Sequence, residues 1–184
     1  NLGKTSLQYR KNMASKVFKI TSEYDNLINN WISNNNNNLK IFNHERSVLR
    51  YGENPHQKSF IYKNRLKNNL FKHCFQQNKK LSYNNVLDAS SAFECLSEFK
   101  EPTCVIIKHN SPCGVASNKT INKAFLGAYN ADPISAFGGV IALNRKIDEK
   151  TSYLLFNKFF EIIMAPSFNN KAKKILNTKK NLIL

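Results

Sequence analysis

The stretch CVIIKHNSPCGVA places Lys108 directly before His109, between an apolar run and an expected Pro-Cys-Gly turn. A histidine can act as a general base near neutral pH because its usual pKa is about 6.5. A lysine beside it favours the uncharged imidazole by charge repulsion, and Lys108 can also donate a hydrogen bond to a developing oxyanion. Proton transfer at His109 is one interpretation. The other is a strand end, with Lys108 as its cap and His109 bonded to a backbone carbonyl.

A second polar group occupies residues 49–57, LRYGENPHQ. Arg50 carries a planar guanidinium suited to phosphate, and Gly52 permits a close approach of backbone to ligand. Asn54 and His56 add further polar side chains. A phosphate-binding loop and a well-capped turn with an arginine by chance both fit this segment.

Two further segments are ambiguous when taken singly. In LSYNNVLDA, residues 81–89, an asparagine pair before a helical pattern suits either a ligand contact or an N-cap. In DPISAFGGVIA, residues 132–142, Gly138 and Gly139 suit either a ligand site or a tight turn.

The elements that position these residues alternate between helix and strand from Ser82 onward. Apolar residues at helical spacing predict helices, and continuous apolar, β-branched runs predict buried strands. The helices are expected at residues 86–99, 121–130, 148–160 and 168–176, and the strands at 103–108, 138–143 and 161–166. This alternation is typical of an α/β fold with a parallel or mixed sheet covered on both faces. Ligands gather at the carboxyl ends of such strands, where Lys108 and, after the last strand, Ala165 and Pro166 are expected.

The beginning of the chain has a different character. Apolar residues recur at spacings of three and four from Leu7 to Trp31, which predicts a long amphipathic helix. The asparagine-rich run from Ser33 to Asn38 indicates either a linker between two units or an enlarged surface loop.

Composition narrows the function classes. The 184 residues carry a net charge of +16, with 23 Lys against 5 Arg. A basic field attracts phosphorylated or polycarboxylate small molecules. Nucleic-acid binding rests on charge alone, because no helix-turn-helix, zinc-finger or RNP-type pattern occurs.

Without a signal peptide or an apolar run of about 18 residues, we expect a cytoplasmic protein with no membrane contact. Since residue 1 is Asn1 and not methionine, we expect a fragment or a processed chain.

The cysteines Cys74, Cys95, Cys104 and Cys113 are spread out and form no CxxC pair. Two of them lie in or beside apolar runs, so we expect reduced thiols and no metal site. The metal-site alternative also lacks the HxE and PCxxC pattern of zinc deaminases.

Taken in order, five segments closely resemble the transformylase domain of the bifunctional purine biosynthesis family: LRYGENPHQ, LSYNNVLDA, VIIKHNSPCGVA, DPISAFGGVIA and EIIMAP. That family joins 5-aminoimidazole-4-carboxamide ribonucleotide (AICAR) formyltransferase to inosine monophosphate (IMP) cyclohydrolase. The resemblance implies that residues 1–33 end a methylglyoxal-synthase-like cyclohydrolase domain, that residues 34–40 are a linker, and that residues 41–184 begin the transformylase domain. It also implies the fold of the last part, a three-layer, cytidine-deaminase-like half of that domain.

The resemblance further implies an activity and its residues. The family transfers a formyl group from 10-formyltetrahydrofolate to the 5-amino group of AICAR, giving FAICAR, which the first domain closes to IMP. No metal takes part, and the site is built across a homodimer. Motif positions imply catalytic Lys108 and His109, substrate-binding Arg50, Tyr51, Asn85, Phe137 and Gly138, and folate-binding Ser111 and Glu161.

The resemblance also implies a role for three of these residues. His109 assists removal of the amine proton, Lys108 acts at the folate nitrogen and the formyl oxygen, and Arg50 binds the ribonucleotide phosphate. Since the family's transformylase domain is a duplicated unit, we expect the parent protein to be active and this piece alone to be inactive. The alternative is a truncated, non-catalytic α/β module that binds nucleotide or serves assembly.

Overall fold

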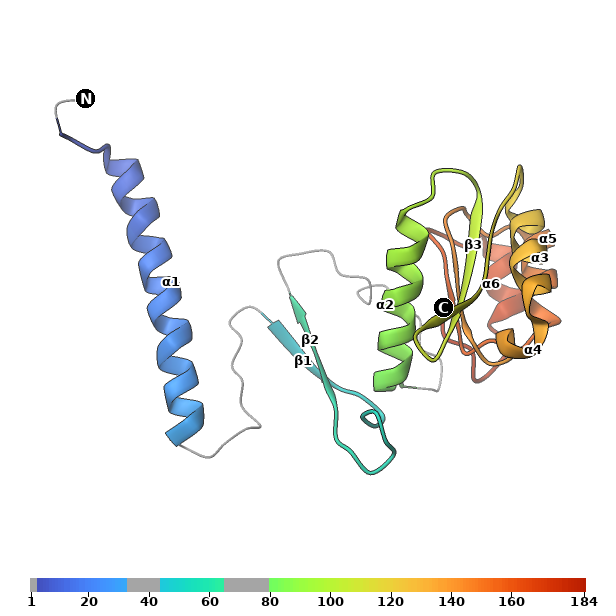
Figure 1. The fold of residues 1–184 in the computed structure, drawn as a ribbon, viewed down its shortest axis with the longest axis horizontal. Coiled ribbons are helices and arrows are strands. Elements are labelled where there is room, and N and C mark those ends of the chain that lie inside the picture. Colours follow the sequence, from blue (N-terminus) through green and yellow to red (C-terminus); the bar gives the residue numbers. More distant parts are fainter. Residues whose placement is uncertain (1–2, 33–43, 65–79) are drawn as a thin grey trace. The chain divides into compact units, whose positions relative to one another are not determined.

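A computed structural model describes residues 3–32, 44–64 and 80–184 of the chain. The chain divides into two compact units, Asn1–His44 and Glu45–Leu184 (Figure 1). The predicted linker at residues 34–40 lies outside the described residues, as does Cys74. The assignment of the chain to parts of two enzyme domains stays a prediction.

The described part of the first unit is dominated by one helix, α1 (Leu7–Ile32), where the apolar spacing predicts it. Ser6 stabilises its start, because the Ser6 hydroxyl accepts a hydrogen bond from the Tyr9 N–H at 3.2 Å. Neither α1 nor any other helix among the described residues is long and apolar enough to cross a membrane.

The second unit begins within β1 (His44–Val48), which forms a two-stranded sheet with β2 (Phe60–Asn64). Leu49 follows β1, and its N–H donates to the Ser59 carbonyl at 3.0 Å. The Leu49 side chain is buried in an apolar cluster with residues of the following helix. This contact anchors the polar segment after β1 to the rest of the unit.

A four-stranded sheet forms the centre of the second unit. Its strands are β3 (Thr103–Lys108), β4 (Ser111–Ser117), β5 (Val140–Leu143) and β6 (Ile162–Met164), in the order β4-β3-β5-β6. β3 is antiparallel to both of its neighbours, whereas β5 and β6 are parallel. The sheet is therefore mixed, and the predicted α/β class is confirmed at this level.

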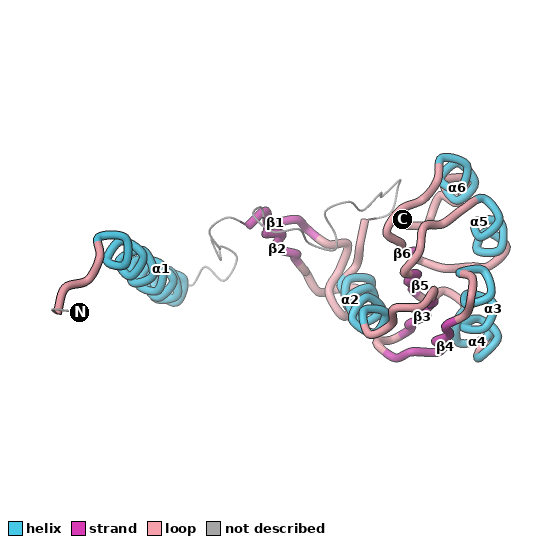
Figure 2. Tube along the Cα trace, turned by 90° about the horizontal axis from the view of Figure 1, so that it is seen from above, coloured by secondary structure: helices cyan, strands magenta, loops and turns pink. Residues whose placement is uncertain are grey.

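Helices cover both faces of this sheet (Figure 2). α2 (Tyr83–Ser97) lies on one face, and α3 (Ile121–Ala131), α4 (Pro133–Ala136), α5 (Glu149–Phe156) and α6 (Asn170–Leu176) lie on the other. The four predicted helices of this unit are confirmed as α2, α3, α5 and α6 with shifted ends. The short helix α4 was not predicted.

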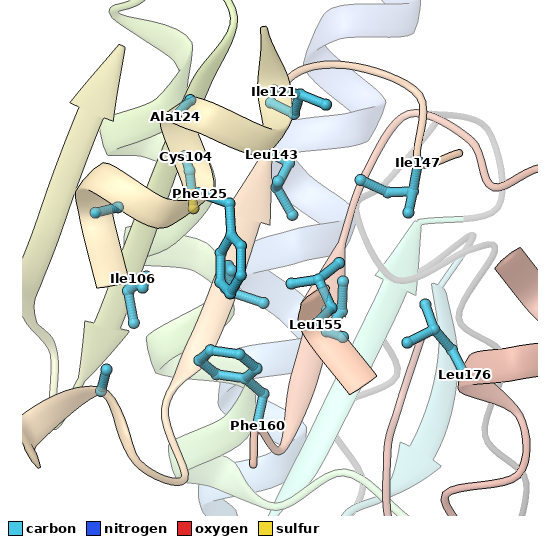
Figure 3. Packing of buried hydrophobic residues seen from close by; sticks show 14 of the residues in the cluster. Cys104, Ile106, Ile121, Ala124, Phe125, Leu143, Ile147, Leu155, Phe160 and Leu176 are labelled. Carbon is cyan, nitrogen blue, oxygen red and sulfur yellow. The ribbon is translucent and has the colours of Figure 1, made fainter. Parts of the chain in front are cut away.

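The two faces of the sheet contribute to two apolar clusters. Successive residues of a strand point to opposite faces, so Ile106 joins the cluster under α3, α5 and α6, whereas Val105 joins the cluster under α2. In the first cluster the rings of Phe125 and Phe160 meet edge to face, with their centroids 6.1 Å apart (Figure 3). Cys104 lies in the same cluster, and burial raises the pKa of its thiol.

The predicted turn at residues 112–114 is wrong, because β4 runs through these residues. β4 is an edge strand, where a proline removes no essential ladder hydrogen bond. The register with β3 shifts at Cys113, which is the extra residue of a β-bulge. Gly114 is needed where α3 packs against the strand, because a Cβ at this position would lie 2.0 Å from the Ala128 carbonyl oxygen.

Candidate active site

One edge of the four-stranded sheet brings together most of the predicted site residues. Because β3 is antiparallel to β5, and β5 is parallel to β6, the end of β3 lies beside the starts of β5 and β6. We call this side of the sheet, where the strand ends lie, the "site edge"; it is distinct from the lateral edge formed by β4. It consists of residues at or next to these strand ends: Lys108, His109, Ser111, Phe137, Gly138 and Glu161.

A tight turn carries His109 at the site edge. β3 and β4 remain paired as far as Lys108 and Ser111, which leaves only His109 and Asn110 in the loop. Both loop residues have positive φ, 53° and 62°, as in a type I′ turn. This backbone region costs a non-glycine residue about 1–2 kcal/mol. His109 is exposed, and no described residue hydrogen-bonds its imidazole.

Lys108 is held by the segment that precedes β5. Its Nζ donates a hydrogen bond to the Phe137 carbonyl at 2.8 Å. Phe137 follows α4, whose start is capped by Asp132, because the Asp132 carboxylate accepts from the Ser135 N–H at 2.9 Å. Hydrogen bonds from Ser135 lower the pKa of Asp132, so the cap stays charged near neutral pH. The carbonyl that holds the Lys108 ammonium therefore has a fixed position.

Phe137 and Gly138 shape the surface next to this lysine. The Phe137 ring is exposed and lies against Phe159, with ring centroids 5.0 Å apart. Gly138 has a φ of 75°, which favours glycine, and its N–H donates to the Phe159 carbonyl at 2.9 Å. The site edge thus presents an exposed aromatic face beside a lysine ammonium.

Asn85 reaches the site edge from α2. It forms a capping box with Ser82: the Asn85 side-chain oxygen accepts from the Ser82 N–H at 3.1 Å, and the Ser82 hydroxyl accepts from the Asn85 N–H. The Asn85 amide nitrogen donates to Glu161 Oε2 at 2.8 Å. Asn85 is buried, so both ends of its amide are positioned by these contacts.

Arg50 and Tyr51 lie beside the start of α2. The Arg50 N–H donates to the Leu81 carbonyl at 2.8 Å, and the Tyr83 N–H donates to the Tyr51 carbonyl at 3.1 Å. The Arg50 guanidinium stacks over the Tyr51 ring at 4.7 Å and donates to the Tyr51 hydroxyl at 2.9 Å. Since Asn85 belongs to the first turn of the same helix, α2 joins this pair to the site edge.

Comparisons with known proteins identify the family of the chain. The family described as AICARFT/IMPCHase bienzyme matches residues 1–184. The chain belongs to this family.

Several curated members of the bienzyme family carry the name "Bifunctional purine biosynthesis protein PurH". The chain is 46% identical over 186 residues to the protein of Thermoanaerobacter sp. (strain X514) and 43% identical over 189 residues to that of Bacillus subtilis (strain 168). It is 44% identical over 200 residues to that of Buchnera aphidicola subsp. Schizaphis graminum (strain Sg). These matches cover 98%, 99% and 100% of this chain. The chain spans only 37%, 37% and 38% of the relatives' own length.

Two polar residues that were not predicted also reach the turn at His109. Asp88 and Ser91 lie on α2, three residues apart, and both hydrogen-bond Asn110. The three-residue spacing of Asp88 and Ser91 is the one sequence feature that could have indicated them. Polar pairs with this spacing are common on helix surfaces. The turn itself could not be placed next to α2 without the fold.

Ala165 and Pro166 do not join the site edge. β6 runs antiparallel to β3, so its carboxyl end lies at the opposite edge of the sheet. These two residues line an apolar cavity of about 750 Å³ together with side chains from α2, among them Phe93 and Leu96. They follow the carboxyl end of β6, as expected, but this strand end does not lie beside that of β3, which carries Lys108.

Potential metal ligands are not clustered in the part of the chain that is described. Within residues 3–32, 44–64 and 80–184, no three His, Cys, Asp or Glu side chains are grouped to hold a metal ion. Cys95, Cys104 and Cys113 are free thiols. Burial is also the main cause that raises the pKa of Cys113.

Proposed function

We propose that the protein carrying this chain transfers a formyl group from 10-formyltetrahydrofolate to AICAR, giving FAICAR, and that the complete protein closes FAICAR to IMP. The observation that carries this proposal is the site edge, where Lys108 is hydrogen-bonded to the Phe137 carbonyl and strand pairing brings His109 and Glu161 to the same side of the sheet. The relatives' name, a bifunctional protein of purine biosynthesis, supports the same activity.

The proposed transfer breaks one carbon–nitrogen bond and forms another. The 5-amino nitrogen of AICAR attacks the formyl carbon, and the bond from that carbon to N10 of the folate breaks. His109 takes the proton that the amine loses, and Lys108 supplies the proton that N10 gains. The amine is a poor nucleophile because its lone pair is delocalised, so positioning and electrostatic stabilisation must supply most of the acceleration.

The hydrogen bonds of the site edge suit these roles. An ammonium has three hydrogens, and the Phe137 carbonyl accepts only one from Lys108. The ammonium is therefore oriented and can still donate to the formyl oxygen, where negative charge develops. The next residue is His109, whose exposed imidazole is accessible to an incoming amine.

The proposed substrate contacts lie at the motif positions. We assign Arg50 to the ribonucleotide phosphate, because its guanidinium is exposed and already oriented by Tyr51. Asn85 gives one amide hydrogen to Glu161 and has a second for the carboxamide of AICAR. Phe137 with Gly138 borders the substrate. Ser111 and Glu161 are assigned to the folate.

The wider assignments belong to the same proposal. Residues 1–33 would end the cyclohydrolase domain, residues 34–40 would link it to the next, and residues 41–184 would begin a transformylase domain with cytidine-deaminase-like layering. Two compact units and a sheet with helices on both faces support this division. We also propose a cytoplasmic homodimer with AICAR and formylfolate as its small-molecule partners.

A His109→Asn variant of the full-length protein tests the assignment. Asparagine tolerates positive φ, so the turn is retained while the base is lost. We expect kcat for formyl transfer to fall by about 10²–10⁴-fold, the usual contribution of a general base. The KM for AICAR and the thermal melting temperature should remain close to wild type.

Two outcomes would contradict the proposal. Near-normal turnover by His109→Asn would return Lys108-His109 to a strand end without chemistry. A folded wild-type protein that binds AICAR without transferring formyl would favour the non-catalytic module.

A further inference from the structure

The His109–Asn110 turn requires an external support. Within the described part of the chain these are the only non-glycine residues with positive φ, and they are consecutive. Asparagine at the second turn position is less favourable than the glycine that type I′ turns usually carry. The turn is exposed, so core packing does not hold it.

α2 supplies that support through two side chains. Asp88 Oδ1 accepts a hydrogen bond from the Asn110 N–H at 2.7 Å. The Ser91 hydroxyl hydrogen-bonds the Asn110 side-chain oxygen. Since a carboxylate acceptor makes a stronger bond than a neutral one, Asp88 is the main restraint. Both residues are half-buried on a helix that packs against β3.

α2 also positions the proposed substrate contacts. Asn85 precedes Asp88 by three residues, so the two lie on the same side of the helix. Arg50 and Tyr51 are bonded to the residues at the start of α2. One rigid element therefore sets the turn relative to the groups assigned to AICAR.

We infer that Asp88, assisted by Ser91, is a positioning residue for the proposed base His109: it holds Asn110 in the left-handed conformation and so orients the imidazole toward the bound amine. This inference rests on the proposed function. Asp88 does not itself contact substrate. Its removal should impair the chemical step more than substrate binding.

Asp88→Ala in the full-length protein is the first test. Alanine is a good helix former, so α2 should remain intact. We expect kcat for formyl transfer to fall by about 10–100-fold, as for misplaced catalytic groups, with little change in the KM for AICAR. Asp88→Asn keeps an oxygen acceptor at the same place and should recover most of this loss. Glu94→Ala, on an exposed position of the same helix, is the matched control and should change neither constant.

An Asn110→Gly background tests whether Asp88 acts through the turn. Glycine adopts positive φ without cost, so the turn no longer depends on α2. In this background Asp88→Ala should lower kcat much less than it does in the wild type, which is a coupling measurable by a double-mutant cycle. Deuterium exchange of the peptide spanning residues 106–113 should be faster in Asp88→Ala and unchanged in Glu94→Ala.

The results separate two kinds of failure. If His109→Asn is inactive while Asp88→Ala matches Glu94→Ala in kcat, the positioning role is wrong and the proposed function stands. Equal effects of Asp88→Ala in both backgrounds, or unchanged exchange of the turn peptide, would overturn the inference as well. A folded wild-type protein without formyl transfer would overturn the proposed function, and with it the positioning of a base.

Discussion

The two edges of the central sheet use polar side chains in opposite ways. At the edge where β5 ends, Asn144 is bonded at both ends of its amide: its oxygen accepts from the Thr103 N–H at 2.8 Å, and its nitrogen donates to the carbonyls of Phe99 and Glu101. At the site edge the imidazole of His109 has no hydrogen-bond partner among the described residues. The amide of Asn144 is therefore satisfied within the chain, whereas the imidazole of His109 is presented to solvent.

The backbone shows the same contrast. Asn144 closes a regular strand end, where its N–H donates to the Thr103 carbonyl at 3.2 Å. The site edge contains two consecutive residues in an unfavourable conformation, which α2 must restrain. Unfavourable backbone that is held in place marks candidate functional positions, because stability alone gives no reason for it. The difference predicts that substitutions at the two edges affect different properties.

The largest expected effect is on activity at the site edge. Lys108→Met in the full-length protein removes the ammonium and keeps the apolar stem. We expect kcat for formyl transfer to fall by about 10²–10³-fold, as for loss of one oxyanion donor. The free energy of unfolding should fall by only about 1 kcal/mol, because a single hydrogen bond to the Phe137 carbonyl is lost. Urea denaturation and steady-state assays on the same preparation measure both quantities.

Asn144→Ala should have the reverse profile. The substitution removes three hydrogen bonds and leaves the N–H of fully buried Thr103 without its acceptor. An unsatisfied buried donor costs about 1–3 kcal/mol, so we expect a loss of this size in the free energy of unfolding. Formyl transfer per folded molecule should be unchanged.

Asn118→Ala is the control for this substitution. Asn118 is an exposed asparagine near the same edge, and among the described residues its side chain accepts only from the N–H of neighbouring Lys119. Its removal should change stability by less than about 0.5 kcal/mol. The comparison of the two edges breaks down if Asn144→Ala lowers turnover of the folded protein, or if both asparagine variants are equally stable.

Much of the fold could be predicted because local signals agree with it. The continuous apolar run of β3 and the helical spacing in α2, α3 and α5 match the structure closely. The β3–β4 hairpin was missed because its strand contains a proline and a glycine, which usually indicate a turn. Pro112 is accommodated by the sheet edge and Gly114 by close packing against α3. Both reasons depend on tertiary contacts, which the local sequence does not show.

The candidate site likewise has a part that the sequence predicts and a part that only the fold determines. The motifs identify Arg50 and Lys108, whose chemistry stands out locally. The hydrogen bond between Asn85 and Glu161 joins residues 76 positions apart and depends on β6 lying beside β5. Asp88 is one of several polar residues on a helix surface, and only the placement of the hairpin gives it a partner. Sequence patterns therefore indicate the chemical groups, while non-local pairing determines which of them meet.

Two aspartates that make the same kind of contact should differ in the property that they affect. Asp148 accepts from the Thr151 N–H at 2.8 Å at the start of α5, as Asp88 does from the Asn110 N–H in the turn. Loss of an N-cap acceptor costs about 1 kcal/mol. Asp148→Ala should therefore lower the free energy of unfolding by that amount and leave kcat unchanged, whereas Asp88→Ala should lower kcat.

The pH dependence of Asp148→Ala sharpens this last test. Hydrogen bonds from the Thr151 hydroxyl and N–H lower the pKa of Asp148 in the folded chain. A depressed folded-state pKa contributes stability that is complete above the unfolded pKa and is lost as pH falls through the folded pKa. The difference in unfolding free energy between wild type and Asp148→Ala should thus be constant near neutral pH and shrink below about pH 4, the usual range of an aspartate. A difference that persists unchanged in acid would show that side-chain packing, and not the charged cap, stabilises α5.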